Sequence, residues 1–192
     1  DSSSVLLEVK KSFMDPLYMK REHGRDQVDL VFHGDTGCYT MLMFAPNEVL
    51  MHNYSGMGLG GGTGAGIDPF ITNKQVVFMG DSTFFHGGMV AISDALKHDQ
   101  DITFIILENG TTAMTGHQPT PANTCDVAGG STIAQSIEEV IGGMIRGTEI
   151  KTHRVNPAYR KMYRDLLEET ILKAGVKVII ADKECAITLY RR

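Results

Sequence analysis

The sequence has little of several features that mark whole classes of protein. Its three cysteines, Cys38, Cys125 and Cys185, are odd in number and widely spaced, so we expect no disulfide framework. No apolar stretch approaches the ~20 residues that span a bilayer, and the N-terminus carries no signal-peptide pattern. The net charge of −5 and the lack of a Lys/Arg cluster argue against nucleic-acid binding. We therefore expect a cytoplasmic protein that binds neither a membrane nor a nucleic acid.

What the chain does have is a regular alternation of strand and helix patterns. Its 192 residues suffice for one substantial core, and we find no repeat or low-complexity linker, so we expect a single domain over residues 1–192. The patterns predict strands at 28–32, 49–52, 75–79, 102–107, 149–155 and 176–181, and helices at 4–15, 83–97, 131–146 and 157–174. This order predicts an α/β fold, a doubly wound and mostly parallel sheet with helices on both faces. Ligands of such sheets bind at the carboxyl ends of the strands.

Two polar side chains follow neighbouring strands of this predicted sheet. Asp81 comes after the strand at 75–79, and Asn109 comes after the strand at 102–107. Parallel strands joined by a crossover helix end at the same edge, so the two side-chain oxygens should converge there. A hard divalent cation that holds a diphosphate requires such oxygens.

The glycine-rich segment at 58–66 allows more than one interpretation. It contains a Gly-x-Gly-x-x-Ala match, but no convincing buried strand precedes it and no ribose-binding acid follows at the expected distance. No Gly-Lys-Ser/Thr follows, which excludes a nucleotide-binding P-loop. We favour a helix of small residues that lets another helix or chain pack closely.

Beyond these patterns, the segment Gly80-Asp81-Ser82 followed after twenty-five residues by Glu108-Asn109 resembles the Gly-Asp-Gly…Asn-Asn motif of thiamin-diphosphate enzymes. Ser82 and Glu108 depart from that motif at positions that do not bind the metal. Together with the stretches at 34–40 and 112–119, the motif resembles the thiamin-diphosphate domain of 2-oxoacid:ferredoxin oxidoreductases, most closely the alpha subunit of indolepyruvate ferredoxin oxidoreductases.

The resemblance implies a cofactor, a metal and a role for each matched residue. Asp81, Asn109 and the carbonyl of Thr111 would bind Mg²⁺. Around thiamin diphosphate, it places Gly80, Ser82 and Thr83 at the diphosphate, Gly34, Gly37 and Cys38 near the thiazolium ring, and Thr112, Ala113 and Met114 over the cofactor. Among the polar residues near the substrate, His86 and His117 are candidates, and His117 is favoured as catalytic because it lies in a matched stretch.

The cysteines allow two interpretations. In related oxidoreductases an iron–sulfur cluster lies near the thiamin, and Cys38 and Cys185 match two of its ligands by position. The resemblance therefore includes a possible [4Fe-4S] cluster, but such a cluster needs four thiolates, and the Cys-x-x-Cys that would supply the others is absent from this sequence. The other interpretation is a pair of buried free cysteines.

The implied activity is the oxidative decarboxylation of a 2-oxoacid, such as an aryl pyruvate, to an acyl-CoA, with ferredoxin as electron acceptor. Thiamin catalysis also needs a pyrimidine-binding domain, which 192 residues do not accommodate, so a second subunit or domain should complete the site. Two alternatives remain. One is a subunit of a non-redox thiamin-dependent 2-oxoacid decarboxylase, and the other is a structural or regulatory subunit that keeps the fold without turnover.

Overall fold

A six-stranded sheet forms the centre of the computed structural model, which describes residues 2–191, so residues 1 and 192 of the expected domain lie outside it. All neighbouring strands are parallel, in the order β2-β1-β3-β4-β6-β5. The strands are β1 (Leu30–Gly34), β2 (Asn53–Tyr54), β3 (Lys74–Gly80), β4 (Ile102–Glu108), β5 (Thr152–Val155) and β6 (Lys177–Asp182).

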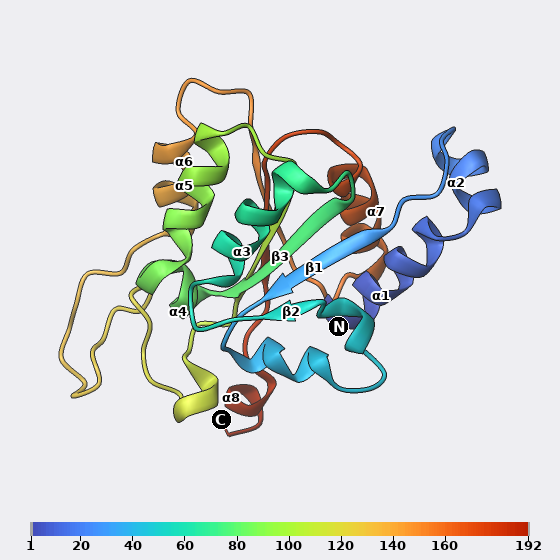
Figure 1. Ribbon diagram of the computed structural model, residues 1–192. Coiled ribbons are helices and arrows are strands. Elements are labelled where there is room, and N and C mark those ends of the chain that lie inside the picture. Colours follow the sequence, from blue (N-terminus) through green and yellow to red (C-terminus); the bar gives the residue numbers. More distant parts are fainter. Residues whose placement is uncertain (1, 192) are drawn as a thin grey trace.

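Helices cover both faces of this sheet (Figure 1). They are α1 (Ser2–Phe13), α2 (Pro16–His23), α3 (Gly60–Ile67), α4 (Asp81–Thr83), α5 (Met89–Lys97), α6 (Ile137–Met144), α7 (Arg160–Ile171) and α8 (Ala186–Arg191). Helices α1, α2 and α7 bury apolar residues in the core on one face, and α3, α5 and α6 do so on the other. Because successive strand residues point to opposite faces, Val76 and Phe78 of β3 join the first core, while Val77 and Met79 join the second. The predicted doubly wound α/β fold is confirmed.

No helix within the described residues is long and apolar enough to cross a membrane.

Two predicted elements are wrong in their details. A strand was predicted at 49–52, but its first residues belong to a 3₁₀ turn, Glu48–Leu50, in which Leu50 N donates to Asn47 O (2.8 Å). Strand pairing starts only at β2. The predicted helix at 131–146 is confined to α6, because Ser136 caps it by accepting a hydrogen bond from Glu139 N (3.2 Å).

The structure also contains helical segments that the patterns did not indicate. Helix α2 begins directly after α1, since Asp15 accepts hydrogen bonds from Leu17 N and Tyr18 N and Pro16 suits the first turn. The helix predicted at 83–97 is interrupted between α4 and α5 by a π-helix, Phe84–Gly88. Further 3₁₀ turns lie at Cys38–Met43, Asp68–Phe70 and Ala113–Thr115.

The glycine-rich segment forms α3, as the small-residue interpretation predicted. An added Cβ at Gly60 would lie 2.9 Å from the carbonyl carbon of Gly34, and one at Gly61 would lie 2.6 Å from the Ala91 Cβ. Glycine therefore lets α3 approach β1 and α5 closely. The carboxylate of Asp35 accepts hydrogen bonds from Gly58 N (3.1 Å) and Gly60 N (3.3 Å), so a side chain of the protein already takes the place that a dinucleotide phosphate would need.

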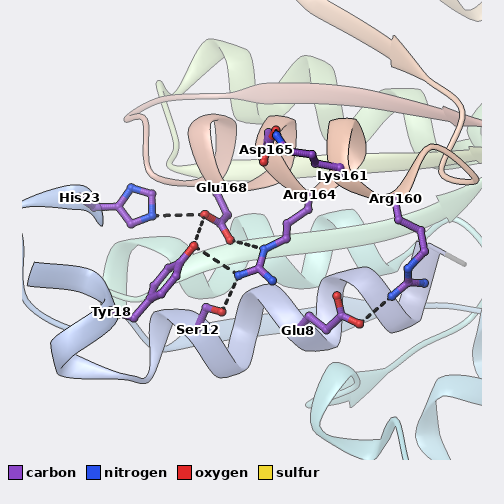
Figure 2. A network of polar contacts seen from close by, with 9 residues as sticks. All are labelled: Glu8, Ser12, Tyr18, His23, Arg160, Lys161, Arg164, Asp165 and Glu168. Carbon is purple, nitrogen blue, oxygen red and sulfur yellow. Dashed lines mark hydrogen bonds and ion pairs between the residues drawn. The ribbon is translucent and has the colours of Figure 1, made fainter. Parts of the chain in front are cut away.

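A network of polar side chains joins α1, α2 and α7 at the edge of the first core (Figure 2). Glu168, which is mostly buried, accepts hydrogen bonds from Tyr18 Oη and Arg164 Nε, both at 2.8 Å, and lies 3.4 Å from His23 Nε2. Arg164 also donates to Ser12 Oγ (2.8 Å). The network therefore couples the first two helices to the helix that covers the same face of the sheet.

We expect Arg164→Ala to lower the free energy of unfolding by about 1–3 kcal/mol, because it leaves the buried Glu168 carboxylate without its cation. Lys161→Ala is a matched control, since Lys161 forms an exposed ion pair with Asp165 on the same helix. Its removal should not measurably change the free energy of unfolding. Urea denaturation of the three proteins measures both effects. Equal stability of the two variants would contradict the role given to Glu168.

Candidate functional site

The ends of β3 and β4 form the base of the site. These strands pair in parallel, with Gly80 opposite Leu107, so the residues that follow them emerge side by side. The Asp81 carboxylate, only 2 % exposed, accepts hydrogen bonds from Ser82 N (2.7 Å) through Oδ1 and from Asn109 N (3.2 Å) and Gly110 N (2.8 Å) through Oδ2. The structure thus brings Asp81 and the Asn109 turn together, as the sequence predicted.

Three oxygen atoms at this base fit the donor set of a hard divalent cation. Asp81 Oδ1 accepts the bond from Ser82 N, Asn109 Oδ1 accepts one from Thr111 N (3.0 Å), and the Thr111 carbonyl accepts one from Ala113 N (3.0 Å). Each such oxygen has capacity for a second interaction. Burial raises the pKa of Asp81, and the backbone N–H groups that donate to its carboxylate lower it. A bound cation would favour the charged form further.

Above these oxygens lies a pocket of about 580 Å³, including the part that is open to solvent. It is lined by Thr36, Gly37, Cys38, Tyr39, Met57, Gly80, Asp81, Ser82, Thr83, Leu107, Asn109, Thr111, Thr112, Ala113, Met114 and Thr115. None of these residues is Lys, Arg or His, and Asp81 is the one carboxylate among them. A phosphate in this pocket would therefore meet no cationic side chain from the lining.

One wall of the pocket is the start of a helical run. Gly80 precedes α4, which continues through the π-helix into α5, so the first N–H groups of this run have no backbone acceptor within it, and Ser82 N donates instead to the Asp81 carboxylate. Such a helix start favours anions. Ser82, which departs from the family motif, accepts a hydrogen bond from Thr112 Oγ1 (3.0 Å) and so ties the loop after β4 to this wall.

That loop closes on itself and holds His117 in an unusual conformation. Thr112 N donates to Gln118 O (2.9 Å), and His117 N donates to Thr112 O (3.1 Å). His117 has a φ of 65°, which costs energy for a residue with a Cβ, and its Nδ1 lies 3.3 Å from Thr188 Oγ1 of α8. His117 is not among the residues that line the pocket, and the catalytic role stays a prediction.

Two other candidates also lie outside the lining. Gly34 is buried against Met51, whose Sδ would be 2.4 Å from an added Cβ, so it serves close packing beneath the pocket. His86 lies in the π-helix and is exposed. The remaining predicted cofactor-binding and metal-binding residues, except Cys185, all line the pocket.

The cysteines are free thiols, and Cys38 is exposed rather than buried, so the interpretation as two buried cysteines is wrong for it. Partial burial of its sulfur raises the pKa of Cys38, and the nearby Cys185 thiol adds to the shift. Within residues 2–191, no three His, Cys, Asp or Glu side chains come together as a metal-binding group.

Sequence reasoning did not single out five residues that line the pocket: Thr36, Tyr39, Met57, Leu107 and Thr115. Thr36 and Thr115 lie inside the matched stretches. Leu107 lies in β4 directly before Glu108 of the motif, and Tyr39 directly follows Cys38, so proximity to the matched residues was the available signal. Met57 carried no signal, because its position depends on how the chain returns from β2 to α3.

Comparison with known proteins agrees with this geometry. Residues 35–181 match the family described as thiamine pyrophosphate enzyme, C-terminal TPP binding domain. The chain belongs to this family. The resemblance inferred from the motifs is confirmed.

Similar proteins include subunit IorA of indolepyruvate oxidoreductase from Archaeoglobus fulgidus, 35% identical over 163 residues, and from Methanothermobacter thermautotrophicus, 33% identical over 160 residues. These matches cover 85% and 83% of this chain but only 26% and 25% of the relatives, so the chain spans about a quarter of their length.

Among solved structures, 2-oxoglutarate:ferredoxin oxidoreductase from Magnetococcus marinus has the same fold, with a TM-score of 0.71 at 16% identity over 92% of this chain and 62% of that one. The 4-hydroxybenzoylformate decarboxylase of Rhodococcus jostii gives 0.59 at 14% identity, over 96% of this chain and 32% of that one.

Proposed function

We propose that this chain binds thiamin diphosphate through Mg²⁺ and forms part of a larger enzyme that oxidatively decarboxylates a 2-oxoacid to an acyl-CoA, with ferredoxin as electron acceptor. The observation that supports the metal most strongly is the charge of the pocket. Its lining has one carboxylate and no Lys, Arg or His, so a diphosphate would be repelled unless a divalent cation came with it.

The residues have distinct roles in this proposal. Asp81, Asn109 and the Thr111 carbonyl hold the metal, and the start of α4 presents its N–H groups to the diphosphate. Met114 and the rest of its loop would exclude water from the reactive end, and His117 of the same loop is the candidate polar group for the substrate. Thiamin diphosphate, when bound, supplies a nucleophilic carbon and a cationic ring that accepts the electrons left by carbon dioxide.

The electron acceptor and the thioester product are proposed from the relatives. The similar sequences are named as subunits of indolepyruvate oxidoreductase, which supports an aryl pyruvate as substrate. The similar structure is that of a 2-oxoglutarate:ferredoxin oxidoreductase with coenzyme A bound, which supports ferredoxin and CoA as partners.

We also propose that a second domain or subunit completes the site. The chain spans about a quarter of its relatives, which leaves ample length elsewhere for a pyrimidine-binding domain. At the mouth of the pocket, Met57 and Met114 are 44% and 50% exposed, and apolar side chains of this kind are suited to contact with another domain.

The non-redox decarboxylase remains the second candidate, because the benzoylformate-type decarboxylases share the fold. The higher TM-score with the ferredoxin enzyme and the names of the similar sequences favour the oxidoreductase. A structural or regulatory subunit is less consistent with a pocket whose lining includes Asp81, Asn109 and Thr111, which together offer oxygens suited to a divalent cation.

Asp81→Asn should abolish Mg²⁺-dependent binding of thiamin diphosphate, because it removes the only carboxylate from the pocket lining. Isothermal titration calorimetry with and without MgCl₂ measures this loss. Glu108→Gln is the matched control, since Glu108 ends the adjacent strand but pairs with Arg154 instead of lining the pocket. Unchanged affinity of the Asp81 variant would refute the metal assignment.

The two enzyme candidates differ in their electron acceptor. With the complete enzyme, a panel of 2-oxoacids and CoA, the oxidoreductase should reduce ferredoxin or a viologen dye only when CoA is present. The decarboxylase should release aldehyde without any acceptor. Aldehyde release without dye reduction would therefore support the second candidate.

For the thiols, we propose that Cys38 and Cys185 supply two ligands of a [4Fe-4S] cluster whose other ligands come from outside the described residues. This pairing is supported by the match of both positions to cluster ligands of related oxidoreductases. Interaction with Cys185 also contributes, after burial, to the raised pKa of Cys38. Cys185→Ser should lower the iron and sulfide content of the complete enzyme purified without oxygen, whereas Cys125→Ser should not. Equal iron content in wild type and Cys185→Ser would exclude the pair as ligands.

A further inference from the structure

A buried carboxylate lies behind the pocket, at the end of β1. Asp35 is fully buried, and its Oδ2 accepts hydrogen bonds from Gly58 N and Gly60 N at the start of α3. Its Oδ1 accepts the hydroxyl proton of Tyr39. Burial raises the pKa of Asp35, and these three donated hydrogen bonds oppose the shift. Three donors on one carboxylate are the arrangement expected for its charged form.

Tyr39 connects this carboxylate to the pocket wall. Its ring packs on Gly37, where an added Cβ would lie 2.4 Å from the ring, and lies 3.6 Å from the position of an added Cβ at Gly80. Its hydroxyl is 3.2 Å from Thr83 Oγ1. A tyrosine hydroxyl has one proton, and that proton is donated to Asp35, so the bond to Thr83 must be donated by Thr83.

The direction of this bond changes what Thr83 can offer to a ligand. With its hydroxyl proton given to Tyr39, Thr83 can donate to an anion only through its backbone N–H. The chain from Asp35 through Tyr39 to Thr83 therefore braces the first turn of α4 against the start of α3, with the Tyr39 hydroxyl in the middle of the chain.

We propose that Tyr39 is a positioning residue that, through Thr83, holds the first turn of α4 so that its N–H groups face a bound diphosphate. The proposal rests on the proposed binding of thiamin diphosphate and assigns to Tyr39, a residue of the pocket lining, a role that acts through Thr83 rather than on the reacting atoms. Loss of the hydroxyl would leave a buried oxygen of Asp35 without its donor and release Thr83, and both changes loosen the turn.

The test is a double-mutant cycle on the complete enzyme. Tyr39→Phe keeps the ring and removes the hydroxyl, and Thr83→Val removes the same bond from its other end. We expect each variant to weaken thiamin diphosphate binding about fivefold in calorimetry at saturating MgCl₂, which corresponds to the loss of one hydrogen bond. The double variant should be no weaker than either single variant.

Tyr54→Phe is the matched control. Tyr54 also bonds a threonine hydroxyl near β1, Thr36 Oγ1 at 2.9 Å, but it is exposed and does not line the pocket, so affinity should be unchanged. A second readout needs no cofactor: Tyr39→Phe should speed amide hydrogen exchange of residues 58–66 and 80–86 in the apoprotein, and Tyr54→Phe should not.

The outcomes separate the inference from the function on which it rests. If wild type does not bind thiamin diphosphate, the proposed function fails. If wild type binds it and Tyr39→Phe binds equally well, the positioning role is wrong, even where the melting temperature falls. A double variant markedly weaker than Tyr39→Phe would show that the Thr83 hydroxyl contacts the diphosphate itself, which also overturns the proposal.

Discussion

The site depends on one buried carboxylate that joins the ends of two parallel strands. Asp81 follows β3, yet its oxygens accept N–H groups from Asn109 and Gly110, which follow β4. The register that places Gly80 opposite Leu107 makes these bonds possible. They offset part of the cost of burying the charge. The oxygens that would bind a metal are therefore positioned by the sheet itself, and the loop after β4 extends from a defined point.

A second constraint acts on the opposite wall of the pocket. Helix α3 lies so close to β1 that Gly60 and Gly64 admit no Cβ without displacing backbone or side-chain atoms. That closeness puts the start of α3 within reach of Asp35, whose carboxylate takes the N–H groups of Gly58 and Gly60. Each of the two carboxylates accepts three hydrogen bonds from the chain, one through Oδ1 and two through Oδ2. They differ in position, because Asp81 lines the pocket and Asp35 does not.

Much of the fold, and the meeting of Asp81 with the turn at Asn109, could be predicted, because both depend on local pattern and on the geometry of parallel strands. Alternating strands and helices gave the sheet, and shared strand ends gave the convergence of Asp81 and Asn109. The failures were of another kind. The sequence at 131–136 suits a helix, but backbone bonds such as Thr132 N to Thr124 O (2.9 Å) place it in the long loop.

Side-chain orientation was the other property that no pattern supplied. His117 lies within a matched stretch, but its positive φ and its contact with Thr188, 71 residues later, depend on how the C-terminal helix packs. Tyr39 is the opposite case, a residue that was not predicted although it lines the pocket. Its neighbour Cys38 was chosen from the motif, while the residue that bonds Asp35 and Thr83 could be recognised only once β1, α3 and α4 were in place.

The two departures from the family motif have a common physical explanation. Glu108, at the end of β4, pairs with Arg154 of β5, and Arg154 also pairs with Asp182 of β6 at 2.7 Å. The two ion pairs of Arg154 therefore join the ends of three strands beside the site. Ser82 accepts the hydroxyl of Thr112 and joins the loop to the start of α4. Both side chains support the walls and leave the three oxygens that we propose as metal ligands untouched. The proposed function gives neither position a contact with the metal, so each side chain is available to tie the walls of the pocket together.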